Sequence, residues 1–334
     1  MNIRTSILCA PAICAAAAAL ASCGGGTLTS ENIPVRSAHA SWMAPTAKKQ
    51  VLLYISDYGD GAVHVFSWPK GKLVGTLSGF RRATGECVDK AGDVWITSYV
   101  SAEIVEYAHG GATPIATLSD PGEYPISCAV DPTTGNLAVG NIETTSDDQG
   151  SVAIYPGAQG TPTLYTDPGI DRIFFMDYDH KGNLFVDGRP NSTDGFVFAE
   201  LPEGSGSFTN ITLDQSIGMP AGVQWDGNDV VVGDQQAAYL YRFKLSGSSG
   251  TEVGVTPLDG SADVVQSCIQ GRKVVGPNAD SGNAMIWKYP AGGSATKTID
   301  GLEIPFGAVI SKPNRSVRQS RLSIANPRFA YLGW

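Results

Sequence analysis

Five oxygen-bearing side chains stand at near-equivalent places in a repeating sequence, and together they could bind a metal ion. Each closes or follows a short apolar run; they are Asp57, Asn141, Asp187, Asp234 and Asn278. Carboxylate and amide oxygens are the ligands of a hard cation such as calcium or another divalent ion. The alternative, which we favour, is that Asp and Asn are simply common in loops, where they bond to the local backbone. The sequence therefore offers a candidate metal site but does not fix a cofactor.

The apolar runs that carry these residues belong to a repeat. Its marker glycines, spaced by 43 to 47 residues, are Gly92, Gly135, Gly182, Gly227 and Gly271. A period of this length is typical of a four-stranded propeller blade. Within each period the second strand is the most regular, and six such strands begin near Leu52, Val94, Leu137, Leu184, Val230 and Lys273.

The two ends of the repeat complement each other. No first strand precedes Leu52, whereas "FGAVIS", Phe306 to Ser311, has the pattern of a first strand with no blade after it. A C-terminal strand that completes the N-terminal blade would close the ring and remove exposed strand edges. We therefore predict one all-β domain over residues 51–311, a six-bladed β-propeller with four antiparallel strands per blade.

The first strands end in "VD" and run into "GD" or "GN", as in "VDKAGD" and "VDPTTGN". This pattern resembles the NHL and SMP-30-like group of six-bladed propellers. The resemblance implies the fold, and SMP-30-like lactonases bind a divalent metal at the propeller axis through Glu, Asn and Asp. It therefore implies an alternative function, a metal-dependent hydrolase or lactonase. The chain departs from these enzymes in having "PAG" (Pro220–Gly222) and "PFG" (Pro305–Gly307) where they have "PNG".

The N-terminus is typical of an export signal. Arg4 precedes a short Ala-rich apolar run, and "LASC", Leu20 to Cys23, resembles a bacterial lipobox. We expect residues 1–22 to be a signal peptide, Cys23 to carry lipid and residues 23–50 to be a tether. The alternative is an ordinary secretory signal. The first reading predicts a bacterial cell-envelope protein held at a membrane surface, and both place the mature chain outside the cytoplasm.

Three cysteines remain after Cys9, Cys14 and Cys23 are assigned to the leader and the lipid site. Cys87 lies two residues before Asp89 and Cys128 three before Asp131, so their side chains leave opposite faces of neighbouring inner strands. If those faces meet between the second and third blades, a disulfide between Cys87 and Cys128 is expected. Cys268 would then be the free cysteine.

Charge excludes one class of partner. The formal net charge is −9; because Arg4 lies in the leader and the tail 312–334 carries five basic residues and no acid, residues 23–311 carry −15. An acidic body argues against nucleic acid. The basic tail has no repeat pattern, and we expect it to be disordered.

No constellation in the sequence predicts a catalytic residue. The four histidines are dispersed, and the aspartates that recur at the first-strand ends (Asp89, Asp131, Asp179 and Asp226) are expected to hold turns. Our first hypothesis is a monomeric, lipid-anchored binding or scaffold propeller. Its partner, an unknown protein or small molecule, would bind the face formed by the loops after the second strands, where Tyr58, Tyr99 and Tyr124 offer stacking surfaces.

Overall fold

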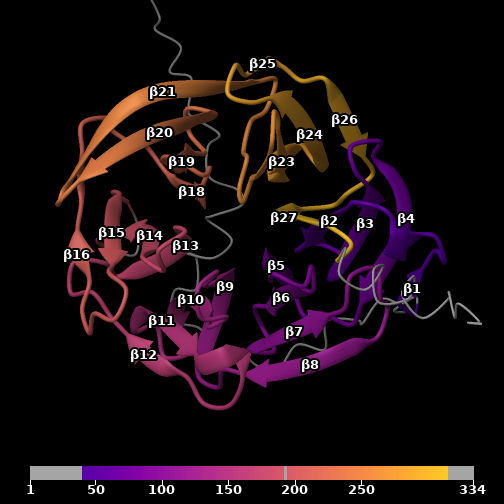
Figure 1. The fold of residues 1–334 in the computed structure, drawn as a ribbon, viewed down its shortest axis with the longest axis horizontal. Helices are drawn as coiled ribbons and strands as arrows, with labels where there is room; N and C mark the ends of the chain where they lie inside the picture. The colour runs from indigo at the N-terminus through magenta and orange to yellow at the C-terminus, as the bar shows by residue number, and fades with distance from the viewer. Residues whose placement is uncertain (1–39, 192–193, 315–334) are drawn as a thin grey trace, which may run out of the picture. The chain divides into compact units, whose positions relative to one another are not determined.

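The computed structural model describes residues 40–191 and 194–314. Six sheets are arranged around a central axis (Figure 1). Four of them have their strands in sequence order from the axis outward; in the first, the C-terminal strand is innermost and the N-terminal strand is outermost, and in the fifth, a short strand from earlier in the chain lies outside the long last strand. The predicted six-bladed β-propeller is confirmed. We number the blades from 1 to 6 in chain order.

The first three blades are built as follows. Blade 1 contains β27 (Pro305–Ser311), β2 (Leu52–Asp57), β3 (Ala62–Ser67), β4 (Lys72–Ser78) and β1 (Trp42–Met43). Blade 2 contains β5 (Ala83–Val88), β6 (Val94–Ser98), β7 (Glu103–Tyr107) and β8 (Pro114–Ser119). Blade 3 contains β9 (Glu123–Val130), β10 (Leu137–Thr144), β11 (Gln149–Tyr155) and β12 (Thr163–Tyr165).

The other three blades vary more at their outer edges. Blade 4 contains β13 (Arg172–Tyr178), β14 (Leu184–Arg189), β15 (Val197–Leu201) and β16 (Thr209–Asn210). Blade 5 contains β18 (Pro220–Trp225), β19 (Val230–Asp234), β20 (Tyr239–Ser246) and β21 (Ser249–Asp259), and the short β17 (Thr212–Leu213) and β25 (Gly293–Ser294) pair with β21 in parallel. Blade 6 contains β22 (Cys268–Gln270), β23 (Lys273–Asn278), β24 (Asn283–Lys288) and β26 (Lys297–Asp300).

The turn between the first and second strands is the repeated local structure. Asp131 accepts the N–H of Thr133 at 2.8 Å, and Asp179 accepts that of Lys181 at 2.8 Å. Asp89 and Asp226 make corresponding bonds to Asp93 and Asn228. An Asp side chain that bonds the backbone ahead of it fixes a tight turn, so these residues are structural, as the repeat suggested.

The C-terminal strand closes the ring, as predicted. Strand β27 pairs antiparallel with β2 from Leu52↔Ser311 to Asp57↔Pro305. Gln266 links the loop before blade 6 to blade 2. Its side-chain amide accepts the N–H of Glu86 at 3.0 Å and donates to the Glu86 carbonyl at 2.8 Å. These bonds pass close to Gly307, where a Cβ would lie 2.8 Å from the Gln266 amide oxygen. Blades 6, 1 and 2 are therefore held together near the axis.

The hydrophobic core lies between neighbouring blades. Trp95, Tyr155 and Trp287 are almost completely buried there, whereas Trp225 is half-buried. Burying such large side chains is a main source of stability in an all-β fold without helices to cover its sheets.

Part of the predicted tether belongs to the folded body. Strand β1 pairs with β4, and a short 3-10 helix, η1 (Ala47–Lys49), follows it, so residues 42–49 of the predicted tether form part of the folded body. The predicted signal peptide, Cys23 and the basic tail beyond Asn314 lie outside the described residues. In the described part, no helix is long and apolar enough to cross a membrane.

Candidate functional site

The face predicted to bind a partner is the upper end of the propeller. We call upper the end at which the first strands begin and the second strands finish, and lower the opposite end. All five predicted metal ligands lie at the upper end of a second strand. Four of them are equivalent in register, because Asp57, Asn141 and Asp234 lie opposite Pro305, Pro125 and Pro220 of their first strands and Asn278 lies opposite Val264, which precedes β22. In blade 4 the equivalent residue is Gly188, opposite Ile173, so Asp187 lies one residue earlier. Because side chains alternate along a strand, Asp187 leaves the other blade face from the other four.

Three of these side chains hold backbone N–H groups in their own blades. Asp57 accepts bonds from Glu303 at 2.7 Å and Ile304 at 2.9 Å. Asp234 accepts one from Gly218 at 2.8 Å. The Asn278 amide oxygen accepts the N–H groups of Ala262 and Asp263. In each case the side chain ties the loop that leads into a first strand to the end of the neighbouring second strand.

The other two, Asn141 and Asp187, are only partly bonded. Asn141 donates from Nδ2 to Asp120 at 2.9 Å and to Ser151 at 3.2 Å, and Asp187 accepts the N–H of Phe175 at 2.8 Å. Asn141 Oδ1 and Asp187 Oδ2 are buried without a hydrogen-bond partner among the described residues. Burial raises the pKa of Asp187 well above its ordinary value, so a proton on this carboxyl is favoured.

Carboxylates and histidines gather in two small groups in the described ranges. Asp57, Asp60 and His64 form one, and Asp89, Asp93 and Glu106 form the other, each with its ligand atoms within 4.8 Å of one another. Neither group contains Asp187 or Asp234. The carboxylates of the predicted set thus act in separate blades rather than as one cluster.

A continuous row of aromatic rings crosses the upper end, and we call it the aromatic tract. Tyr124 stacks on Tyr99 with ring centroids 4.6 Å apart, and Tyr99 lies 6.3 Å from Tyr58. The row continues through Phe306 and ends at the neighbouring pair Phe175 and Phe174. Tyr58, Tyr124 and Phe306 are half-buried, and the other three rings are buried.

The tract passes over the propeller axis. Phe306 belongs to blade 1 and Phe175 to blade 4, three blades away in a ring of six, yet their centroids are 6.0 Å apart. Two rings from opposite blades can meet only near the axis. The upper end of the axis is therefore lined with hydrocarbon at the place where the five oxygen ligands were expected to converge.

Arginines lie against two rings of the tract. The guanidinium carbon of Arg82 lies 4.9 Å from the Tyr58 centroid, and that of Arg189 lies 5.3 Å from the Phe174 centroid. Both distances are those of a cation–π contact. Arg82 has a φ of 65°, a left-handed conformation that is uncommon outside glycine. Two rings of the aromatic tract thus already contact guanidinium groups of the same chain.

A buried arginine supports the loop beside the tract. Arg172 contacts three carboxylates, Glu143 at 3.0 Å, Asp147 at 2.7 Å and Asp171 at 3.1 Å. Burial raises the pKa of Tyr99, and the negative charge of Glu143 adds to the effect. Tyr99 therefore stays protonated and neutral at physiological pH.

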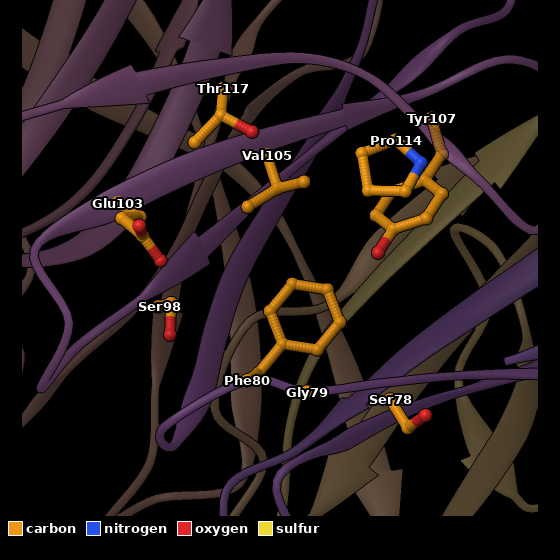
Figure 2. A pocket seen from close by; sticks show the side chains of 9 residues that line it. All are labelled: Ser78, Gly79, Phe80, Ser98, Glu103, Val105, Tyr107, Pro114 and Thr117. Atoms are coloured by element: carbon orange, nitrogen blue, oxygen red, sulfur yellow. The ribbon is translucent and has the colours of Figure 1, made fainter. Parts of the chain in front are cut away.

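A second feature is a groove between blades 1 and 2. It has a volume of about 220 Å³, and Figure 2 shows the Phe80 ring pointing toward Val105 and Tyr107 across it. Glu103 and Thr117 supply polar groups at the same wall. Phe80 and Tyr107 pack together in this groove with ring centroids 6.2 Å apart, and we treat the groove as a lesser candidate than the tract.

The cysteines are arranged in one bridge and one thiol. Cys87 of blade 2 and Cys128 of blade 3 are joined by a disulfide with Cα atoms 5.6 Å apart. Cys268 is free and buried, and burial raises the pKa of its thiol to about 12. Its thiol is thus a core group rather than a nucleophile.

Sequence reasoning found only half of the aromatic tract. It singled out Tyr58, Tyr99 and Tyr124 but missed Phe174, Phe175 and Phe306 and the arginines stacked on the row. A signal was present, because "RIFFMDY" and "PFGAVIS" are both first strands with Phe near the upper end. Aligning the first strands with one another would have placed Phe175 and Phe306 near the axis.

Comparison with known proteins shows the fold. No protein-family model matches the chain, and no curated protein sequence matches it either. Among solved structures, a chain of the nidogen/laminin complex matches with a TM-score of 0.64 at 14% identity, covering 79% of this chain and 99% of that one.

Two further structures agree. A protein of unknown function from Bacteroides caccae has a TM-score of 0.60 at 14% identity, covering 79% of this chain and 100% of the other. The β-propeller domain of Cps50 (Swd1) from Myceliophteria thermophila has a TM-score of 0.52 at 12% identity, covering 81% and 89%. At these identities the likeness concerns architecture, and it shows that the chain has a β-propeller fold.

Proposed function

We propose that this protein is a lipid-anchored, extracytoplasmic binding module of the bacterial cell envelope, and that its upper end binds a cationic partner. The observation that carries the proposal is the aromatic tract, which crosses the upper end with three half-buried rings and meets the axis at Phe306. The resemblance to NHL and SMP-30-like propellers and the lipobox-like "LASC" support the setting. A protein ligand and a small molecule are both compatible with such a surface.

The charge around the tract defines the chemistry of the partner. Exposed carboxylates in the upper loops are Asp60, Glu103, Asp147, Asp148, Asp194, Asp259, Asp280, Asp300 and Glu303. A negative rim attracts cations and speeds their encounter. Arg82 and Arg189 already show that rings of this tract hold guanidinium groups, and the half-buried rings of Tyr124 and Phe306 extend the same surface.

Binding of a hexa-arginine peptide to the full chain tests this proposal. Tyr124→Ala should weaken binding by about tenfold, within the range that cation–π contacts contribute. Trp42→Ala, which removes another exposed aromatic ring far out on blade 1, is the matched control and should bind like the wild type. Equal affinities for all three proteins, or stronger binding of hexaglutamate than of hexa-arginine, would count against an upper-end cation site.

The anchor has its own test. In a bacterial host, the wild-type chain should fractionate with membranes, and Cys23→Ser should be released into the soluble fraction. Mass spectrometry of the N-terminal peptide should show an acylated cysteine in the wild-type protein only. A membrane-bound Cys23→Ser variant would instead indicate another attachment.

A metal-dependent hydrolase or lactonase is the second proposal. One observation favours it, namely the unpartnered buried oxygens of Asn141 and Asp187. A thermal melt after EDTA treatment, with calcium, magnesium, manganese or zinc added back, decides whether a metal binds the folded form. A rise in the midpoint that is lost in Asp187→Ala, Asp234→Ala would support this proposal and justify screening lactones. No shift with any metal would leave the binding module.

A further inference from the structure

The exposed charges of the propeller are sorted between its two ends. Every lysine of the chain lies in the lower half: in a lower turn, at the lower part of a strand, or in η1 beside the lower end of blade 2. Exposed examples from five blades are Lys70, Lys90, Lys181, Lys244 and Lys288. The basic side chains of the upper loops in the described ranges are all arginines, namely Arg81, Arg82, Arg172 and Arg189.

Exposed acids show the opposite distribution. Among the described residues, the exposed carboxylates of the lower half are Glu203 and Asp214, whereas nine lie in the upper loops. The other lower-half acids are at least half-buried, and several hold turns, as Asp131 and Asp179 do. The fully exposed charges of the lower end are therefore mostly lysines, with partly buried carboxylates such as Asp89, Asp93 and Glu106 among them, whereas those of the upper end are mostly carboxylates.

From this we infer that the lower end rests against an anionic lipid bilayer. The exposed lysines are spread over five of the six blades, so a planar surface can approach many of them at once, whereas a narrow ligand would reach only a few. Lysine is a compact charge that suits diffuse attraction to phospholipid headgroups, and such attractions add up. The acidic upper end is repelled by the same surface, which fixes the orientation.

The inference deepens the proposed function by defining the orientation of the protein on the membrane. With the lower end on the membrane, the aromatic tract faces away from it and is open to a partner. The electrostatic contact does not depend on the lipid expected at Cys23, so the two can be separated by experiment. A nucleic acid is the competing occupant of a basic surface; the dispersed lysines favour the bilayer.

Vesicle co-sedimentation of the full chain carrying Cys23→Ser tests the inference. The probes are phosphatidylcholine vesicles with and without about one-third phosphatidylglycerol, a content at which the surface potential is substantial. We expect binding to the anionic vesicles only, and loss of binding in high salt. Lys90→Gln, Lys181→Gln, Lys288→Gln together should weaken it by about tenfold or more, because each lysine adds to the attraction.

Two controls make the result specific. Arg81→Gln, Arg82→Gln, Arg189→Gln removes the same amount of charge from the upper end and should leave vesicle binding unchanged. Arg315→Gln, Arg318→Gln, Arg321→Gln, Arg328→Gln alters only the basic tail and should retain most of the binding. Circular dichroism melts of all variants establish that each is folded.

Several outcomes would overturn the inference. One is equal binding to both kinds of vesicle. Another is an equal loss of vesicle binding in the upper-end and lower-end variants, or a loss in the tail variant alone. A third is binding of polyuridylate in place of vesicles. None of them alters the hexa-arginine result at the upper end, so failure of the membrane contact and failure of the proposed binding site remain distinguishable.

Discussion

Phe175 and Phe306 lie with their ring centroids 6.0 Å apart, although they belong to opposite blades of the propeller. Their contact joins the two sides of the ring at its upper end. It also places an apolar patch at the axis, beneath the surface that we propose binds a partner.

The two rings should differ in their effect on stability. Phe175 is 1% exposed, so Phe175→Ala should lower the free energy of unfolding by about 3–5 kcal/mol, the usual cost of removing a buried phenyl ring. Phe306→Ala should cost less because its ring is only half-buried. Urea titrations followed by tryptophan fluorescence measure both, and a larger loss for Phe306 would contradict the described burial.

The disulfide between Cys87 and Cys128 should stabilise the protein. It closes a loop of 41 residues, for which chain entropy predicts a contribution of about 4 kcal/mol. Unfolding midpoints with and without a reductant should therefore differ for the wild type and coincide for Cys87→Ala, Cys128→Ala. Cys268→Ala keeps the bridge and is the control; reductant should still shift its midpoint.

Gly307→Ala should weaken the closure of the ring. A Cβ at this position would lie 2.8 Å from the Gln266 amide oxygen and 2.9 Å from the Thr84 carbonyl, so the strands must move apart. A loss of about 1–3 kcal/mol is expected from such overpacking. Gly206→Ala, at a site with open space, should be close to neutral.

A double-mutant cycle isolates the reason for that loss. If Gly307→Ala acts by displacing the Gln266 amide from Glu86, then Gln266→Ala should lower the free energy of unfolding much less in the Gly307→Ala background than in the wild type. Additive losses of unfolding free energy would show that Gly307 is required for a reason other than leaving room for the Gln266 amide.

Asp177 should make the protein less stable at alkaline pH. Burial raises its pKa to about 7, outweighing the bonds from the N–H groups of Trp225 and Tyr178, which lower it. An unfolded Asp titrates near pH 3.9, so between about pH 4 and pH 7 the folded state binds the extra proton and stability falls as pH rises. Above pH 7 the full penalty applies.

Thermal melts of Asp177→Asn across this range measure the effect. Because an Asn amide can accept only one of the two N–H groups that Asp177 accepts, the diagnostic quantity is the pH dependence: the midpoint of the variant should change less between pH 5 and pH 8 than that of the wild type. Glu203→Gln, an exposed substitution at the lower end, should follow the wild-type profile. Parallel profiles for Asp177→Asn and the wild type would show that the carboxyl is not the source of the pH dependence.

The architecture was predictable because it is repeated. Six second strands, the turn aspartates and the C-terminal closing strand each leave a local pattern in the sequence, and repetition averages out the noise in any single copy. Strand β1 and the pairing of β17 and β25 with β21 were not foreseen, since short edge strands have no alternation to detect. The pairing of each such strand depends on which outer strand lies beside it in the folded protein.

The candidate site was only partly predictable for a different reason. Its residues come from blades that are distant in the chain, and which rings meet over the axis depends on the tilt and register of each first strand. Gln266 and Glu86 are 180 residues apart, and no local pattern links them. The five oxygen ligands were placed at the correct strand ends, but a shift of one residue between blades reverses the direction of a side chain.

The closing strand ties folding to the end of synthesis. Blade 1 obtains its innermost strand from residues 305–311, so β2 has an unpaired edge until nearly the whole chain described here has been made. During that interval the exposed edge can pair with other chains. Premature termination before Pro305 would leave every other blade intact in sequence and yet yield an open ring, which makes such products natural substrates for proteases and chaperones.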